Sequence, residues 1–269
     1  MRRLRGLVHG WCRLGSLPGT RHSTLAPLQG ECLPPELAEA WKNPDIAQRQ
    51  RALTDAQLLQ MRSGTVLADW QALREAVETT GKSRGRILEI GCSTGYHLEV
   101  LERLLGHPVN YTGVDYSEAM IASAQEHYPD GTFAVEEASC LSIDDAAFDV
   151  VISGCVLLHV PDYAAAIAES ARVSRGWVIL HRTPITRGPT QFYRHDAYGV
   201  ECVIIRFNEE EILDLCRASG LEVRHTIRIA EGEPANITYV LKRTQADGRP
   251  RPEAEARATT APTPADEPR

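Results

Sequence analysis

The sequence lacks several features that would mark whole classes of protein. No apolar run approaches the roughly 18 residues of a membrane-spanning helix. The seven cysteines are odd in number and contain no CxxC pair, which favours reduced, buried thiols over a disulfide framework or a zinc site. Histidine and acidic residues form no clustered ligand set, so no metal is expected. We therefore predict a soluble protein, and 269 residues suffice for one domain with a sizeable core.

Acidic residues are missing from positions 1–30, where five arginines occur among glycine and proline. Because the whole chain has a net charge of −7, the remainder is strongly acidic, which argues against a broad nucleic-acid footprint. The Arg-rich segment is either a targeting peptide of the mitochondrial kind or an untargeted, poorly ordered extension. The expected location is the cytoplasm, with the mitochondrion as the alternative.

Large aliphatic side chains are absent beyond Lys242, where prolines recur, so this tail cannot bury a core. The chain is thereby divided into four regions. We predict a poorly ordered extension over residues 1–33, a helical segment over 34–80, an α/β domain over 81–243 and a disordered tail over 244–269.

A short apolar strand followed by a turn of small residues organises the α/β domain. The stretch RILEIGCSTG covers residues 86–95, and a helical pattern follows it. Such a turn lets the backbone approach a nucleotide-like ligand closely, because glycine carries no Cβ. The dinucleotide fingerprint GxGxxG would require glycine where the chain has Ser93 and Tyr96, so that fingerprint fails.

The same turn fits another cofactor class. Glu89, Gly91 and Gly95 are spaced as in the ExGxGxG loop of class I S-adenosylmethionine-dependent methyltransferases, which this stretch resembles, with Ser93 in place of the middle glycine. The resemblance implies S-adenosylmethionine as the cofactor and a small-molecule acceptor. It also implies these cofactor-binding residues: Glu89, Gly91, Cys92, Ser93, Gly95, Asp115, Tyr116, Glu137, Ala138 and Ser153.

Two acidic positions support the cofactor hypothesis. Asp115 ends the strand expected over 110–115, near the offset of a ribose-binding acid, where its carboxylate accepts from both hydroxyls. The alternative is that Asp115 only caps the helix beginning near Ser117. Glu137 and Ala138 follow the next strand, where this family reads adenine with an acid and a backbone amide. The alternative there is a solvated loop acid beside Glu136.

The alternation of strand and helix predicts a three-layer αβα sandwich with right-handed crossovers. Expected strands lie at 86–90, 110–115, 132–136, 148–153, 177–181, 221–229 and 237–242, and expected helices at 117–128, 164–173 and 208–219. The family resemblance adds a Rossmann-like, seven-stranded, mostly parallel sheet in the order 3-2-1-4-5-7-6.

The helical segment over 34–80 precedes the cofactor strand, and in this family such a segment often covers the site. Arg49, Arg51 and Arg62 are candidates to meet the cofactor carboxylate or the substrate there. The alternative is that they belong to solvated helix faces. Of the three, Arg62 is the one that we predict as a substrate contact.

Residues 153–160, SGCVLLHV, resemble the segment that faces the methyl group in small-molecule methyltransferases. They lack the motifs of enzymes that methylate base or glutamine amino groups, or cytosine carbon. His159 is the candidate general base, because a neutral imidazole takes up a proton near pH 7. The alternative is a structural histidine. His181, at the end of the fifth strand, is a weaker candidate for the same role.

The long segment 183–207 shows little helical periodicity and contains aromatic and polar side chains. We predict a substrate lid with Tyr193, His195 and Tyr198 as candidate contacts; the alternative is that its aromatic residues only anchor the loop. The predicted activity is methyl transfer to an oxygen or nitrogen of a small molecule. Two alternatives are a catalytically silent S-adenosylmethionine-binding protein and an NAD(P)-dependent oxidoreductase on a similar sheet.

Overall fold

The computed structural model describes residues 26–28 and 33–244. The predicted extension over 1–33 and the predicted tail over 244–269 therefore lie almost wholly outside the described residues. No helix in the described ranges is long and apolar enough to cross a membrane.

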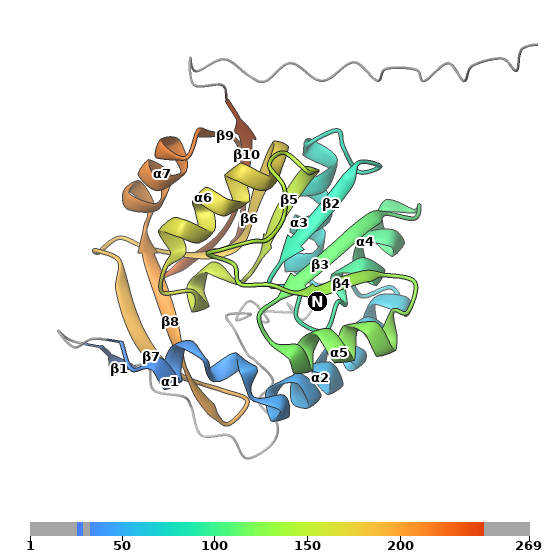
Figure 1. Cartoon of the computed structure of the whole chain (residues 1–269), viewed down its shortest axis with the longest axis horizontal. Coiled ribbons are helices and arrows are strands. Elements are labelled where there is room, and N and C mark those ends of the chain that lie inside the picture. The colour runs from blue at the N-terminus through green and yellow to red at the C-terminus, as the bar shows by residue number, and fades with distance from the viewer. Residues whose placement is uncertain (1–25, 29–32, 245–269) are drawn as a thin grey trace, which may run out of the picture.

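Within the described residues the strands form one ten-stranded sheet, and seven of them make up its middle layer (Figure 1). Its order is β4-β3-β2-β5-β6-β10-β9, which confirms the order 3-2-1-4-5-7-6. The strand β10 is antiparallel to both neighbours, whereas the strands from β4 to β6 are parallel. The strands are β2 (Arg86–Ile90), β3 (Asn110–Asp115), β4 (Thr132–Val135), β5 (Phe148–Gly154), β6 (Ser174–Thr186), β9 (Leu221–Ala230) and β10 (Ala235–Arg243).

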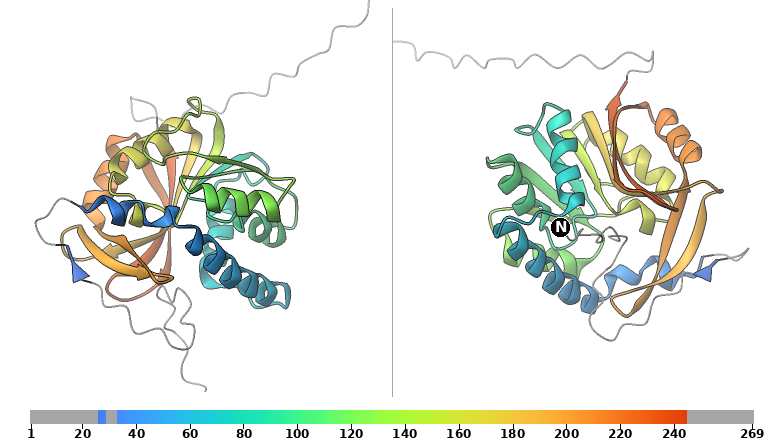
Figure 2. Two further views of the ribbon diagram at one scale, coloured as in Figure 1. Left: turned by 60° about the horizontal axis from the view of Figure 1, so that its bottom comes forward. Right: turned by 180° about the vertical axis from the view of Figure 1, so that it is seen from behind.

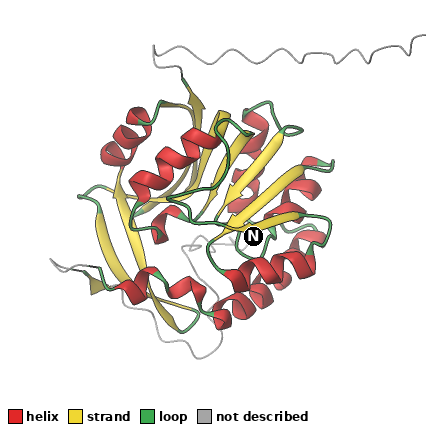
Figure 3. Ribbon diagram, in the orientation of Figure 1, coloured by secondary structure: helices red, strands yellow, loops and turns green. Residues whose placement is uncertain are grey.

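Helices cover both faces of this sheet (Figure 3). One apolar cluster joins it to α3 (Ala68–Thr79), α4 (His97–Leu105) and α5 (Glu118–His127). Another joins it to α6 (Tyr163–Val173) and α7 (Glu209–Ala218). Neighbouring residues of a strand point to opposite faces, so Ile87 packs in the first cluster and Leu88 in the second. This double burial explains the continuous apolar runs of the strands.

The interpretation of 183–207 as a loop without regular structure was wrong. The strand β6 continues to Thr186, and a hairpin follows, made of β7 (Gln191–Ala197) and β8 (Val200–Asn208). Tyr198 and Gly199 form its two-residue turn with φ angles of 56° and 80°. Two consecutive positive φ angles suit the twist of a tight hairpin. The usual Asn-Gly or Asp-Gly signal is replaced by Tyr-Gly, which is why the turn escaped prediction.

The N-terminal helices lie along the edge of the sheet beside this hairpin (Figure 2). They are α1 (Pro35–Ala38), the 3-10 helix η1 (Ala40–Lys42) and α2 (Pro44–Arg62). The ring of Trp41 meets Tyr198 edge-on at 6.2 Å, and Arg49 donates to the Tyr198 carbonyl oxygen. The short strand β1 (Ala26–Pro27) pairs with β7 on its outer side. The helical segment and the hairpin therefore hold each other in place.

Candidate functional site

A cavity of about 250 Å³ opens at the carboxyl ends of the parallel strands and is covered by α1, η1 and α2. This edge of an open α/β sheet is where ligands bind. Nine residues predicted from the sequence line the cavity: Glu89, Gly91, Cys92, Ser93, Asp115, Tyr116, Glu137, Ala138 and His159.

The turn after β2 is fixed by bonds to the neighbouring strand. The amides of Gly91 and Cys92 both donate to the carbonyl oxygen of Val114, at 2.8 and 3.0 Å. Gly91 has a φ of 72°, and a Cβ built on it would lie 2.4 Å from the Cβ of Val156. A glycine is therefore required here by backbone conformation and by packing.

Asp115, at the end of β3, is hydrogen-bonded to the turn after β2. One carboxylate oxygen accepts from the amide of Ser93 at 2.9 Å, and the other accepts from the amide of Ser117 at 3.0 Å. The Ser93 amide is therefore bonded to Asp115 in this structure. The bond to Ser117 means that Asp115 also supports the start of α5. Burial raises the pKa of Asp115 to about 6, although the two amide bonds oppose this shift.

Two further contacts join the covering helices to the turn after β2 and to the end of β3. Ser93, at a φ of 53°, donates its hydroxyl to the side chain of Gln50 in α2. The Tyr116 hydroxyl accepts from the Trp41 amide at 3.0 Å and donates to the Ala38 carbonyl oxygen at 3.1 Å. The left-handed conformation of Ser93 is one that glycine adopts more easily.

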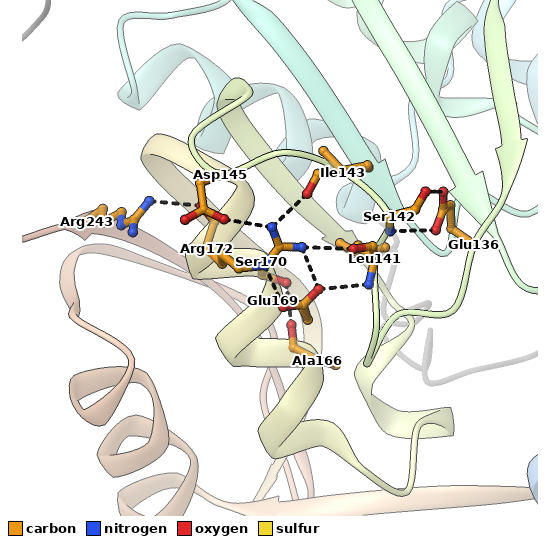
Figure 4. A network of polar contacts seen from close by, with 10 residues as sticks. All are labelled: Glu136, Leu141, Ser142, Ile143, Asp145, Ala166, Glu169, Ser170, Arg172 and Arg243. Atoms are coloured by element: carbon orange, nitrogen blue, oxygen red, sulfur yellow. Dashed lines mark hydrogen bonds and ion pairs between the residues drawn. The ribbon is translucent and has the colours of Figure 1, made fainter.

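The loop carrying Glu137 and Ala138 is held by Arg172 of α6 (Figure 4). The Arg172 guanidinium donates to the carbonyl oxygens of Leu141 and Ile143 at 2.9 and 2.7 Å, and to the carboxylate of Glu169. Donors on every edge of a planar guanidinium suit this role. A segment without helix or strand is thus kept in one position at the cavity wall.

Glu89 is a buried carboxylate that its neighbours satisfy. It bonds to the Nδ1 atom of His97 at 2.7 Å and accepts from the Tyr111 hydroxyl at 2.5 Å. A Cβ on Gly154 would lie 2.0 Å from its Oε1 atom, so only glycine fits opposite. Glu89 is 1% exposed and lines the cavity, and the two bonds to His97 and Tyr111 use part of the hydrogen-bond acceptor capacity of its carboxylate.

His159 lies in the cavity wall against Trp41, with ring centroids 4.6 Å apart. Its Nδ1 atom is 2.8 Å from the carbonyl oxygen of Val203. A carbonyl oxygen only accepts, so Nδ1 carries the hydrogen and Nε2 keeps its lone pair. Burial lowers the pKa of His159 to about 4, which leaves the imidazole neutral at pH 7.

Several predicted site residues lie outside the cavity lining: Gly95, Ser153, His181, Arg62, Tyr193, His195 and Tyr198. The buried His181 has its Nδ1 atom 2.9 Å from the Thr238 hydroxyl. Tyr193 stacks under Arg206 on the hairpin, whereas Tyr198 packs against Trp41 and the cluster of Met120, both of which line the cavity. The structure therefore does not bring the predicted substrate contacts together.

Arg62 forms a two-bond ion pair with Glu99 of α4, both bonds being 2.8 Å long. We expect Arg62→Ala to leave the affinity for S-adenosylhomocysteine within about twofold of wild type, since its partner lies away from the cavity. The unfolding free energy should fall by no more than about 1 kcal/mol. Calorimetry and thermal unfolding measure the two quantities, and a tenfold loss of affinity would restore Arg62 to the site.

Sequence reasoning missed several residues that line the cavity: Trp41, Gln50, Tyr96, Met120, Cys155, Arg182 and Ile204. Arg182 and Cys155 carried a usable signal, because they lie one and two residues beyond the expected ends of two parallel strands. Both have left-handed backbone angles, with φ of 59° and 64°. Strained residues of this kind gather at functional sites.

Comparison with known proteins identifies the kind of site. Residues 88–180 match the family model described as "Methyltransferase domain". The ubiquinone biosynthesis O-methyltransferase of Leptothrix cholodnii is 30% identical over 184 residues, which are 61% of this chain and 75% of that protein. The malonyl-[acyl-carrier protein] O-methyltransferase of Bacillus cytotoxicus is 36% identical over 86 residues, which cover only 30% of its length.

Solved structures show the same fold. A 1,6-didemethyltoxoflavin-N1-methyltransferase from Burkholderia thailandensis, with bound 1,6-didemethyltoxoflavin and S-adenosylhomocysteine, superposes with a TM-score of 0.59 at 19% identity. The match covers 84% of this chain and 97% of that one. A methyltransferase from Mesorhizobium loti gives a TM-score of 0.53 at 21% identity, over 67% and 99% of the two chains.

The chain belongs to the class I S-adenosylmethionine-dependent methyltransferases. It is an enzyme of that class, with S-adenosylmethionine as cofactor, and neither the oxidoreductase nor the catalytically silent alternative is favoured. The cavity fits this cofactor: Asp115 presents a buried carboxylate at one wall, and the Nε1 atom of Trp41 is a buried donor with no partner in the described residues.

Proposed function

We propose that this enzyme transfers a methyl group to an oxygen or nitrogen atom of a small-molecule acceptor. The observation that carries the proposal is the cavity of about 250 Å³, which the N-terminal helices cover. A covered space of this size suits a small molecule. The proposal is supported by the similarity of this chain to a ubiquinone biosynthesis O-methyltransferase and to a 1,6-didemethyltoxoflavin-N1-methyltransferase, which act on an oxygen and a nitrogen.

We assign the adenosyl end of the cofactor to the wall formed by β3 and β4. Asp115 would accept from the ribose hydroxyls, and Glu137 with the amide of Ala138 would read adenine. Each charge-assisted bond in such a dry site contributes about 1.5–3 kcal/mol. The same proposal makes 34–80 the covering segment of a methyltransferase domain over 81–243.

The bound cofactor supplies a methyl group on a positively charged sulfonium, which is already activated. The protein must therefore align the acceptor and exclude water, and such alignment contributes about 7–11 kcal/mol toward the barrier. Trp41 links the covering helices to the cofactor side and to the acceptor side of the cavity. Its backbone amide donates to Tyr116, and its ring packs on His159. His159 would accept a hydrogen bond through Nε2 from an acceptor O–H or N–H group and orient it.

The direct test is calorimetric titration of the wild-type protein with S-adenosylhomocysteine and, separately, with NADH. We expect S-adenosylhomocysteine to bind and NADH to give no heat of binding. A protein that binds NADH and does not bind S-adenosylhomocysteine would overturn the cofactor assignment.

Titration with a short RNA duplex at two salt concentrations tests, in the same preparation, whether the protein binds nucleic acid.

The affinity for S-adenosylhomocysteine is expected to depend on pH through Asp115. Its pKa of about 6 lies above the ordinary value of 3.8, so lowering the pH protonates it in the free protein. Ribose hydroxyls donate best to the ionised carboxylate, and binding therefore releases a proton below pH 6. The affinity should fall by up to about tenfold per pH unit well below pH 6. Calorimetry from about pH 5 to pH 8 measures this, with Asp115→Asn as the control whose profile should be flat.

A further inference from the structure

Arg182 is aimed at the cavity by an irregularity in β6. The register of β6 with β10 runs Leu180 to Tyr239 and then Thr183 to Ile237, so two β6 residues oppose the single residue Thr238. Arg182 is the second of these two and has a φ of 59°. Bulges of this kind redirect side chains beside active sites. The first residue of the pair, His181, packs inward, whereas Arg182 lines the cavity.

The Arg182 guanidinium is paired in the wall of the cavity. Its Nη1 atom is 3.2 Å from the carboxylate of Asp69 in α3, and the two side chains are 21% and 19% exposed. The positive charge of Arg182 contributes to lowering the pKa of His159 and opposes the burial that raises the pKa of Tyr96. The charge of Arg182 therefore acts on two residues that line the cavity, His159 and Tyr96. A guanidinium carries five N–H donors in a planar fork, so one arginine can pair with two carboxylates at once.

We propose that Arg182 is a specificity-determining residue that binds a carboxylate carried by the methyl acceptor. This inference rests on the proposed function. The guanidinium fork matches a carboxylate bidentately, and a carboxylate is ionised at pH 7 without help from the protein. A phosphate dianion fits less well, because Glu89, Asp115 and Glu136 also line the cavity.

Apolar side chains in the same cavity lining fit the body of such an acid. Trp41 presents an indole ring, and Val160, Pro161 and Ile204 line the same cavity. An acceptor with a planar, apolar body and one carboxylate would satisfy both kinds of surface. Arg182 acts on binding and orientation, and the proposal assigns it no covalent step.

The test uses benzoate and benzamide as probes, which differ in charge and share their shape. Each is titrated by ligand-observed NMR into wild type saturated with S-adenosylhomocysteine. We expect benzoate to bind at least about tenfold more tightly than benzamide, and more tightly than phenol or phenyl phosphate. Arg182→Gln should remove the preference for benzoate. The matched control is Arg194→Gln, because Arg194 pairs with Glu201 on the outer hairpin at 2.7 Å and does not line the cavity.

The variant Asp69→Asn separates recognition from a merely structural ion pair. It breaks the same pair but keeps the guanidinium, so it should retain or strengthen benzoate binding. If Asp69→Asn and Arg182→Gln lose benzoate equally, the pair is structural and the proposal is overturned. Equal binding of benzoate and benzamide by wild type, including binding of neither, or a preference for phenyl phosphate, also overturns it.

Titration with S-adenosylhomocysteine distinguishes this proposal from the function on which it rests. Arg182→Gln should bind S-adenosylhomocysteine within about twofold of wild type. A tenfold loss would assign Arg182 to the cofactor carboxylate and overturn the proposal. Failure of the proposed function would instead show as absence of S-adenosylhomocysteine binding by wild type itself.

Discussion

Asp115→Ala is expected to weaken S-adenosylhomocysteine binding at least about tenfold. The substitution removes the carboxylate that would accept from the ribose hydroxyls, and it frees the amides of Ser93 and Ser117 that the carboxylate now holds. Each lost charge-assisted bond corresponds to about 1.5–3 kcal/mol in a buried site. Isothermal titration calorimetry near pH 8, where Asp115 is ionised in wild type, measures the difference.

Asp149→Ala is the matched control for this experiment. Asp149 also accepts from a backbone amide, that of Arg86 at 2.8 Å, and pairs with Arg175, but it lies near the opposite end of the strands and does not line the cavity. It should bind S-adenosylhomocysteine as wild type does. Equal affinity of wild type and Asp115→Ala would remove the ribose role of Asp115.

Gly91→Ala is expected to reduce the unfolding free energy by about 2–4 kcal/mol. The added methyl group would have to share space with Val156, and the residue would keep a φ of 72° that alanine adopts at a cost. The turn that contacts the cavity would shift as a result. Thermal and urea unfolding measure the stability, and calorimetry measures the accompanying loss of S-adenosylhomocysteine affinity.

Gly81→Ala separates the two causes. Gly81 has a similar φ of 66°, but a Cβ there meets nothing within 4 Å. We expect it to cost only about 1–2 kcal/mol, from backbone strain alone. If Gly91→Ala is no more destabilising than Gly81→Ala, the contact with Val156 does not constrain the turn.

The core of the fold was predictable because local and long-range signals agree. The apolar runs of β2 and β5 are buried on both faces, and small residues occur at or just after the carboxyl end of each of these parallel strands. Asp115 could be placed at the cavity for the same reason, because the end of β3 must lie beside the turn after β2. The assignment of its role stays a prediction.

The acceptor side was less predictable because it depends on contacts distant in sequence. The bulge that aims Arg182 arises from the pairing of β6 with β10, and no local pattern marks it. The place of Trp41 depends on Tyr116 and Tyr198, which lie 75 residues or more away. Arg62 is the opposite case, because its charge predicts a ligand contact whereas its guanidinium forms an ion pair with Glu99 outside the cavity lining.

The most direct measurement for the whole account is a crystal structure of the protein with S-adenosylhomocysteine. We predict the ribose hydroxyls within hydrogen-bond distance of the Asp115 carboxylate, and the adenine beside Glu137 and Ala138. A ligand seated elsewhere, or a ribose that leaves Asp115 bonded only to Ser93 and Ser117, would contradict it.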